Sequence, residues 1–208
     1  MFDMSDSKNA KKPTFTEEAR RAQILDIALK LFVEKGFDGT SVTEIAKQAE
    51  VSRGVIFYYF DGKRELGEEV IRQNLREYSY YVQSRADKKH TGKAQLMEFV
   101  DACLDYIDVH RDNYLVYIDT IGRFGSTHEK NSLLMLINQR TRELLTAYIK
   151  RAQMDGDLIK TKAVDLADVL QAVIDGLQSL SSVDPDQVNI KNCKKLLKMI
   201  FAQALTPK

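Results

Sequence analysis

The run SRGVIFYYF, residues 52–60, combines side chains that can form hydrogen bonds and apolar contacts with double-stranded DNA. The guanidinium of Arg53 can pair with a guanine edge, and the methyl groups of Val55 can contact a thymine methyl. The hydroxyls of Tyr58 and Tyr59 can donate to phosphate oxygens while their rings pack on sugars. A helix with these side chains on its outer face could read a major groove.

Gly54 and Lys63 could also contribute to DNA binding, Gly54 through the helix backbone and Lys63 at a helix N-terminus. Gly54 would lie inside a helix, where glycine is less favourable than alanine by about 1 kcal/mol. That cost is understandable where DNA must come close to the helix backbone. Lys63 would open the next helix, whose positive N-terminus can hold a phosphate. The alternatives are a locally weak helix at Gly54 and an ordinary solvated pair at Lys63 and Arg64.

Capping residues predict the short helices that would position these side chains. Ser41 and Glu44 have the capping-box spacing, and Ser52 can cap the next helix. The apolar stripe after Ser41 has i, i+3, i+4, i+7 spacing and consists of Val42, Ile45, Ala46 and Ala49. A tight connection at residues 50–51 separates the two helices. This arrangement is typical of a helix-turn-helix.

The rest of the chain also predicts helices. Apolar residues recur at spacings of three and four, and alternation of period two is nowhere sustained, so we expect an all-α fold of about nine helices. The first helix begins near Thr14, with Glu17 as its capping partner, and stops at Gly36. Ile56 and Phe60 of the third helix would pack against it.

Two domains are expected: a helix-turn-helix domain over residues 14–66, with its motif at 41–60, and a second helical domain over residues 67–208. A long fourth helix begins near Lys63 and fades in the polar segment 85–93, which is a candidate boundary between sub-domains. Further helices are expected near 93–109, 112–122, 129–154, 162–182 and 186–204.

Composition excludes several classes of protein. Lys+Arg 31 against Asp+Glu 30 gives a net charge of +1, so any surface for nucleic acid must be local. A signal peptide and a membrane-length apolar run are both lacking, so we expect a cytoplasmic protein without membrane contact. Cys103 and Cys193 form no metal-binding or disulfide pattern. No nucleophile elbow, phosphate loop or Ser/His/Asp arrangement is present, and we expect no enzyme, no catalytic residue, no metal and no cofactor.

The segment 14–66 resembles the DNA-binding signature of the TetR family of bacterial transcriptional regulators. The residues that match the family pattern are Ile45, Ala46, Ala49, Val51, Ser52, Arg53, Gly54, Tyr59, Phe60, Lys63 and Leu66. Two positions depart from it. Glu50 stands where the family usually has a glycine in the turn, and Phe57 replaces a common tyrosine.

The resemblance implies a role for each matching position. Gly54 and Val55 would approach bases. Thr43 and Arg53 would contact a base or a phosphate. Contacts to the DNA backbone are implied for Ser52, Tyr58, Tyr59 and Lys63. Ser41 would mainly cap the second helix.

A single recognition helix reads few base pairs, so such proteins bind palindromic half-sites as two-fold dimers. In resembling proteins the last two helices pair with their symmetry mates as a four-helix bundle. Ala172 and Gly176 lie four residues apart here and permit close helix approach. The expected dimer surface consists of Ala172, Val173, Gly176, Leu177, Leu180, Leu197 and Ile200. Packing within one subunit is the alternative for each of them.

Members of the family usually sense a small molecule in a cavity among the middle helices, which makes residues 67–208 an effector-binding and dimerisation domain. The expected pocket residues are Phe99, Cys103, Tyr106, Tyr114, Tyr117 and Arg123. An aromatic lining with few polar groups suits an apolar or aromatic ligand. Ordinary core packing of these aromatics is the alternative.

These features together predict a ligand-responsive transcriptional regulator. We expect a repressor that binds a palindromic operator in double-stranded DNA as a homodimer and is released by a small apolar or aromatic effector. The alternative is a DNA-binding nucleoid or interaction factor on the same scaffold that senses no metabolite. Binding sites away from promoters would favour that alternative.

Overall fold

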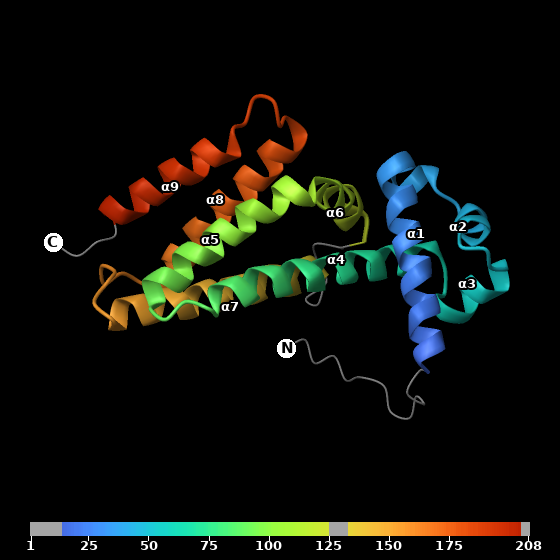
Figure 1. Ribbon diagram of the computed structural model, residues 1–208, viewed down its shortest axis with the longest axis horizontal. Coiled ribbons are helices and arrows are strands. Elements are labelled where there is room, and N and C mark those ends of the chain that lie inside the picture. Colours follow the sequence, from blue (N-terminus) through green and yellow to red (C-terminus); the bar gives the residue numbers. More distant parts are fainter. Residues whose placement is uncertain (1–13, 125–132, 205–208) are drawn as a thin grey trace. The chain divides into compact units, whose positions relative to one another are not determined.

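The described part of the chain is built from helices (Figure 1). A computed structural model describes residues 14–124 and 133–204. Within them the helices are α1 (Phe15–Gly39), α2 (Val42–Gln48), α3 (Arg53–Tyr59), α4 (Lys63–Ala86), α5 (Gly92–Val109), α6 (Arg111–Phe124), α7 (Leu133–Met154), α8 (Ala163–Val183) and α9 (Ile190–Ala204). The prediction of an all-α fold with about nine helices is therefore confirmed.

The chain forms two compact units, one ending at Leu66 and the other beginning at Gly67. The polar segment 85–93, expected as a candidate boundary, lies inside the second unit, so that prediction was wrong. Val82 and Ala86, near the end of α4, are buried in the same core as α5. The polar residues mark a connection between two packed helices.

In the first unit, α1 begins at the predicted capping box. The Thr14 hydroxyl accepts from the Glu17 amide at 3.3 Å, and the Glu17 carboxylate accepts from the Thr14 amide at 2.6 Å. Gly36, with φ of 72°, breaks the helix as predicted, and a short further turn ends at Gly39. The buried Thr40 hydroxyl then donates to the Gly36 carbonyl at 2.9 Å.

The helices α2 and α3 also begin at the predicted caps. The Ser41 hydroxyl accepts from the Glu44 amide at 3.1 Å, and the Ser52 hydroxyl accepts from the Val55 amide at 3.4 Å. The Glu44 carboxylate pairs with Lys35 of α1. The buried residues of the two helices and their flanks are Ile45, Ala46, Ala49, Ile56 and Phe60.

The turn between α2 and α3 contains a strained residue. Glu50 has φ of 54°, in the left-handed region that disfavours side chains with a Cβ atom. The Val51 amide nevertheless closes the turn by donating to the Ala46 carbonyl at 3.0 Å. Glycine, which the resembling family usually has at this position, would adopt this conformation without strain.

We therefore expect Glu50→Gly to raise the free energy of unfolding by about 1 kcal/mol, because it relieves this strain. Urea denaturation would measure the change. Gln48→Gly, at the exposed last residue of α2, is the control and should lower stability by up to about 1 kcal/mol. A Glu50→Gly variant less stable than the wild type would contradict the prediction.

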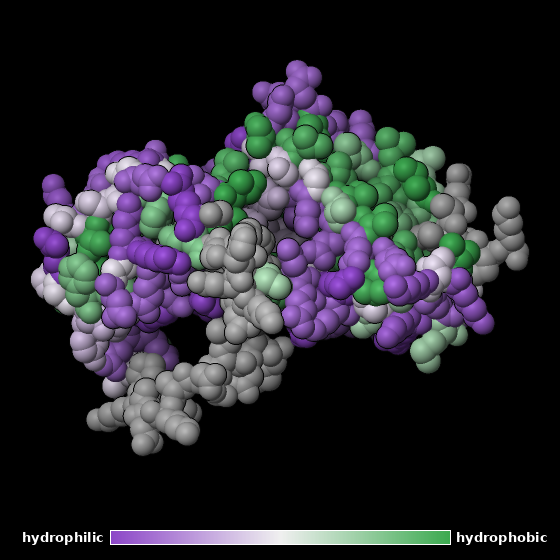
Figure 2. All heavy atoms as spheres, turned by 180° about the vertical axis from the view of Figure 1, so that it is seen from behind, coloured by the Kyte–Doolittle hydropathy of each residue, from purple (hydrophilic) through white to green (hydrophobic). Residues whose placement is uncertain are grey.

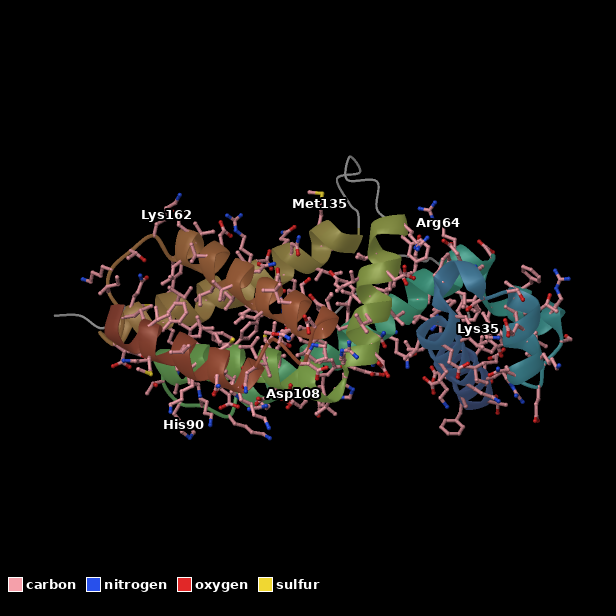
Figure 3. The ribbon with its side chains drawn as sticks, turned by 90° about the horizontal axis from the view of Figure 1, so that it is seen from above. Lys35, Arg64, His90, Asp108, Met135 and Lys162 are labelled. Atoms are coloured by element: carbon pink, nitrogen blue, oxygen red, sulfur yellow. The ribbon has the colours of Figure 1, made fainter. Side chains whose placement is uncertain are left out.

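In the second unit, α5 lies at the centre of a core shared with α7 and α8. Side chains fill the space between these helices (Figure 3). The core includes Leu96, Phe99, Val100, Leu104, Leu145, Ile149, Leu170 and Ile174. At the start of α5, the Gly92 amide donates to the Asp155 carboxylate at 2.9 Å. A Cβ atom on Gly92 would lie only 2.2 Å from the backbone nitrogen of Ala152 in α7.

Ion pairs join α4, α5 and α9 on one side of this unit. Arg85 of α4 donates to Glu98 at 2.7 Å and to Asp105 at 2.9 Å, and Lys194 of α9 also pairs with Asp105. Partial burial alone raises the pKa of Glu98 and Asp105, but hydrogen bonds outweigh it, and both pKa values lie below the ordinary ones. These hydrogen bonds come from Arg85 and Lys89 to Glu98, and from Lys194 and Arg85 to Asp105.

The helix α9 begins later than the predicted residue 186. The Asp184 carboxylate accepts from the Gln187 amide at 3.2 Å, which closes a turn instead of starting the helix. The Asn189 side chain then accepts from the Asn192 amide at 3.0 Å and caps α9. The predicted start of the helix 129–154 lies outside the described residues.

Candidate nucleic-acid interface and ligand cavity

The solvent-facing side of α3 forms a ridge, made of the cap Ser52 and of Arg53, Gly54, Phe57 and Tyr58. Phe57 is 46% exposed and Tyr58 71% exposed. Val55 and Tyr59, expected on the outer face, are half-buried beside the anchor Ile56. The exposed ridge is therefore narrower than the sequence indicated.

Contacts on this ridge orient its polar side chains. The guanidinium carbon of Arg53 lies 5.9 Å from the centre of the Phe57 ring. The Tyr58 ring meets Tyr59 edge to face, with 4.9 Å between centroids. The Tyr58 hydroxyl donates to the Glu17 carboxylate at 3.2 Å, and this bond raises the pKa of Tyr58. A phosphate would have to replace Glu17 as the acceptor.

The residues that flank the ridge differ in how exposed they are. Ser41 and Thr43, at the start of α2, are exposed. Lys63 is half-buried, since its ammonium donates to the Asp38 carbonyl at 3.3 Å and lies 4.4 Å from the Phe37 ring. Contact between Lys63 and a phosphate would require exchange of this hydrogen bond.

The backbone of α3 at Gly54 is open to solvent. A Cβ atom there would meet its nearest neighbour, the Ser52 hydroxyl, at 3.6 Å, which is an ordinary contact. The packing of the protein itself therefore does not require glycine. The close approach of DNA to this part of the backbone stays a prediction.

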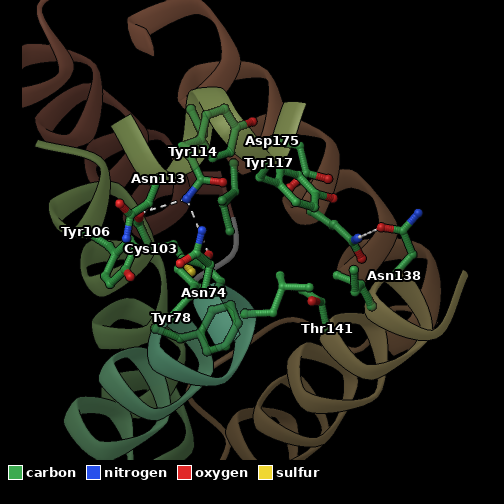
Figure 4. Close-up of a pocket in the computed structure, with 16 residues that line it drawn as sticks. Asn74, Tyr78, Cys103, Tyr106, Asn113, Tyr114, Tyr117, Asn138, Thr141 and Asp175 are labelled. Carbon is green, nitrogen blue, oxygen red and sulfur yellow. Dashed lines mark hydrogen bonds between the residues drawn. The ribbon is translucent and has the colours of Figure 1, made fainter. Parts of the chain in front are cut away.

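A cavity of about 260 Å³ lies within the second unit, among α4, α5, α6, α7 and α8 (Figure 4). Of the expected pocket residues, Phe99, Cys103, Tyr106, Tyr114 and Tyr117 line it. The lining residues that sequence reasoning missed are Asn74, Leu75, Tyr78, Asn113, Ile137, Asn138, Thr141, Gln171, Ile174, Asp175 and Gln178.

Arg123 corrects the expectation, because it does not line the cavity. It lies on an exposed side of α6, where its guanidinium donates to the Asp119 carboxylate at 2.8 Å. The charged group that lines the cavity instead is Asp175, which lies between the apolar positions Ile174 and Leu177 of α8. A carboxylate next to the apolar stripe of this helix was the signal that could have identified it.

The cavity is aromatic with one charged side chain. Among the described lining residues, Asp175 has the single carboxylate, and no Lys, Arg or His is present. Asp175 keeps access to water at the open side of the cavity, but partial burial raises its pKa above the ordinary value, against a hydrogen bond from Gln171. Burial, followed by the charge of Asp175, raises the pKa of Tyr114 and Tyr117 to about 12.

Gln178 and Cys103 are two further polar residues that line the cavity. The buried Gln178 amide donates to the Cys103 carbonyl at 2.8 Å and to the Tyr78 hydroxyl at 3.3 Å. Burial raises the pKa of the Cys103 thiol to about 12, so the thiol stays protonated and unreactive. Cys103 and Cys193 are both free cysteines.

Hydrophobic side chains gather on the surface over α8 and α9 (Figure 2). We call this surface the apolar face; its exposed members are Val169, Leu180, Val183, Leu196, Met199 and Ile200. Of the other expected dimer residues, Ala172 is exposed, and Val173, Gly176 and Leu177 are half-buried. Leu197 is 8% exposed and belongs to the core of its own unit, so its assignment to a dimer surface is corrected.

Two features are absent from the described residues: a membrane-spanning helix and a cluster of metal-binding side chains. None of them combines the length and the apolar character that crossing a bilayer requires. Within residues 14–124 and 133–204, no group of three or more His, Cys, Asp or Glu side chains could hold a metal ion.

The chain matches known proteins along most of its length. Residues 24–70 match the family of bacterial regulatory proteins named tetR, and residues 92–206 match the C-terminal domain of BetI-type transcriptional repressors. The HTH-type transcriptional regulator BetI of Vibrio vulnificus (strain YJ016) is 27% identical over 187 residues, which cover 90% of this chain and 93% of that protein. The HTH-type transcriptional repressor KstR2 of Rhodococcus jostii (strain RHA1) is 28% identical over 158 residues, 74% of this chain and 75% of that protein.

A solved structure shares the fold. It is a putative transcriptional regulator from Saccharomonospora viridis in complex with choline, with a TM-score of 0.80 and 21% sequence identity, covering 92% of this chain and 99% of that chain. The helix-turn-helix of the first unit and the helical second unit agree with these matches. The chain therefore belongs to the TetR family of bacterial transcriptional regulators, with a C-terminal domain of the BetI type.

Proposed function

We propose that the protein is a repressor that binds a palindromic operator as a homodimer and releases it when a small organic cation enters the cavity. The observation that carries the proposal is Asp175, the single charged side chain among the described residues of an aromatic cavity. The ridge on α3 supports operator binding, and the apolar face supports a dimer.

The chemistry of the cavity favours a cation with an apolar body. Aromatic faces attract organic cations through the ring quadrupole, and a nearby carboxylate supplies the opposite charge. Tyr114 and Tyr117 are close enough to Asp175 for its charge to raise their pKa values, so they would surround a ligand at this carboxylate. Choline, which is bound in the similar Saccharomonospora viridis structure, has this character. The effector expected from the sequence keeps its apolar part and gains a positive charge.

Release of DNA follows from unequal affinities. An effector can weaken operator binding only by the ratio of its affinities for the DNA-bound and the released conformation of the dimer. We expect choline to lower operator affinity about 10- to 100-fold, within the usual range of such coupling. Fluorescence anisotropy on labelled promoter DNA from beside its own gene, with and without choline, tests this. Unchanged affinity for that DNA at saturating choline would refute the cationic effector.

The proposal predicts that the response to choline depends on Asp175. Asp175→Asn should bind the same DNA with unchanged affinity but no longer respond to choline, and Asp108→Asn, at an exposed position of α5, should respond like the wild type. Choline keeps its charge at every pH, so its binding should weaken as pH falls and Asp175 is protonated. Because the pKa of Asp175 is raised, this loss begins at a higher pH than for an aspartate with the ordinary pKa of about 3.9. The asparagine variant should show no such pH dependence.

The apolar face is proposed to pair with the same face of a second copy. Scattered apolar residues are normal on a surface, but several exposed aliphatic side chains together on α8 and α9 are typical of an interface. The ammonium groups of Lys194 and Lys198 pair with acidic residues of α5, which leaves the apolar side of α9 available to a partner.

Leu180→Asp is expected to raise the dimer dissociation constant at least about tenfold, because each symmetry-related copy would bury a carboxylate. Analytical ultracentrifugation measures it. Met154→Asp, at an 87% exposed position at the end of α7, is the matched control and should leave the dimer intact. Equal dissociation constants for the two variants would place the interface elsewhere.

The alternative is a DNA-binding factor that senses no metabolite. The cavity, with Asp175 as the single charged side chain among its described lining residues, favours the ligand-responsive function, because a factor that senses no metabolite needs no such cavity. DNA binding that no small cation changes, at sites away from promoters, would favour the alternative.

A further inference from the structure

The described residues of the first unit have no excess of positive charge that would attract DNA in general. Residues 14–66 contain eight Lys or Arg residues and nine Asp or Glu residues. Their affinity for a polyanion must therefore come from individual contacts, and a carboxylate close to the ridge on α3 weakens it. Glu17 of α1 has such a carboxylate, because it accepts a hydrogen bond from Tyr58 on the ridge.

The Glu17 carboxylate is held in place from two sides. Its Oε2 atom accepts from the Thr14 amide at 2.6 Å, as part of the capping box of α1, and its Oε1 atom accepts from the Tyr58 hydroxyl at 3.2 Å. The hydrogen bonds with Thr14, and to a smaller extent the one from Tyr58, lower the pKa of Glu17 below its ordinary value. A fixed negative charge therefore lies beside the ridge at neutral pH.

The Tyr58 hydroxyl has a single proton to donate. It donates that proton to Glu17, while its ring packs edge to face against Tyr59 with 4.9 Å between centroids. The phosphate oxygens of DNA accept hydrogen bonds and have no proton to offer, so Tyr58 cannot bond to Glu17 and to a phosphate at the same time. Both acceptors are anionic, so both bonds are charge-assisted and comparable in strength. Exchange of Glu17 for a phosphate therefore gains little.

We propose that Glu17 limits the affinity of the ridge for DNA, because it holds the Tyr58 hydroxyl in the free protein and repels the phosphate that would replace it. Such a carboxylate keeps binding to unrelated DNA weak, while base contacts such as that expected of Arg53 hold the protein at its operator. The inference rests on the proposed binding of DNA through the ridge and is independent of the proposed effector.

Glu17→Gln tests the inference, because glutamine removes the charge and is itself a capping-box residue. Fluorescence anisotropy gives the affinity for an unrelated duplex at low salt and for promoter DNA from beside the gene. Glu17→Gln should bind both DNAs about three- to tenfold more tightly, the size of one exposed charge contact in each subunit. Because the expected change is a gain, loss of folding cannot imitate it. Unchanged or weaker binding of both DNAs would overturn the inference, and the proposed function would stand if Arg53→Ala still weakened operator binding.

A second substitution shows whether Glu17 acts through Tyr58. Tyr58→Phe removes the hydroxyl and keeps the ring that packs against Tyr59. In the wild type it should change DNA affinity less than about twofold, because Glu17 already holds the hydroxyl. In the Glu17→Gln background it should weaken binding about threefold or more, because a neutral amide holds the hydroxyl less strongly and a phosphate can take it. Equal effects in the two backgrounds would overturn the inference, since Glu17 would then act by its charge alone.

Glu18→Gln is the matched control. Glu18 is exposed in the same first turn of α1, and its replacement removes the same charge. It should tighten DNA binding less than Glu17→Gln does and leave the effect of Tyr58→Phe unchanged. An equal gain in affinity from Glu18→Gln would overturn the inference, because the general charge of the unit would explain it. A wild type that bound no duplex even at low salt would refute the proposed function and this inference together.

Discussion

Replacing Arg53 with alanine is expected to lower operator affinity about a thousandfold. Arg53 is exposed at the start of α3, and its guanidinium lies against the Phe57 ring, which limits the directions in which it can point. A bidentate contact to a base is worth about 1–3 kcal/mol. A dimer makes the contact in both half-sites, so a loss of about 2 kcal/mol in each gives about three orders of magnitude. Anisotropy titration against the promoter fragment measures it.

Lys30→Ala is the matched control. Lys30 is exposed on α1, outside the predicted motif, and its loss removes the same charge from the same unit. Its effect should be less than about tenfold and should shrink at higher salt, as for a nonspecific electrostatic contribution. The Arg53 effect should be largest on the specific site and small on unrelated DNA. If Arg53→Ala weakened binding to all sequences equally, Arg53 would be a phosphate contact.

Gly92→Ala is expected to destabilise the second unit by about 3 kcal/mol or more. The added methyl group would lie 2.2 Å from the Ala152 nitrogen and 2.6 Å from the Arg151 carbonyl carbon, both backbone atoms of α7. No rotamer change relieves contact with a backbone, so α5 and α7 must separate, which places the cost at the upper end for overpacking. The amide of Gly92 would also move from the Asp155 carboxylate.

Thermal and urea unfolding measure this change. Gly39→Ala is the control, because a Cβ atom there would meet the Lys35 side chain at an ordinary 3.5 Å. The control should stay within about 0.5 kcal/mol of the wild type. A Gly92→Ala variant with unchanged stability would show that α5 and α7 can move apart freely.

Helix starts and breaks were predictable because their causes are local. Thr14, Ser41 and Ser52 each accept an amide hydrogen bond from the residue three positions on, as their spacing predicted. Gly36 interrupts α1 because glycine adopts the positive φ found there without strain. The start of α9 was placed too early, because the Asp184 side chain competes for the amide of Gln187.

The cavity was only partly predictable. Aromatic residues at helical spacing indicated the right helices. Five of the predicted pocket residues line the cavity: Phe99, Cys103, Tyr106, Tyr114 and Tyr117. Arg123 and Leu197 were misplaced, because residues on one helix stripe can face solvent, a cavity or the core depending on which helices pack beside it. Periodicity gives a direction around one helix axis and does not say what lies in that direction.

The sequence by itself determined the all-α class, the family of its DNA-binding segment and the caps that set α1, α2 and α3. These depend on residues within a few positions of one another or on a short contiguous motif. Only the tertiary structure decided that Asn74, Tyr106 and Asp175 share one cavity, and that Gly92 must be small. Those facts depend on residues from different helices, which come together only when the helices pack. No local pattern in the sequence indicates which residues of different helices will be close together.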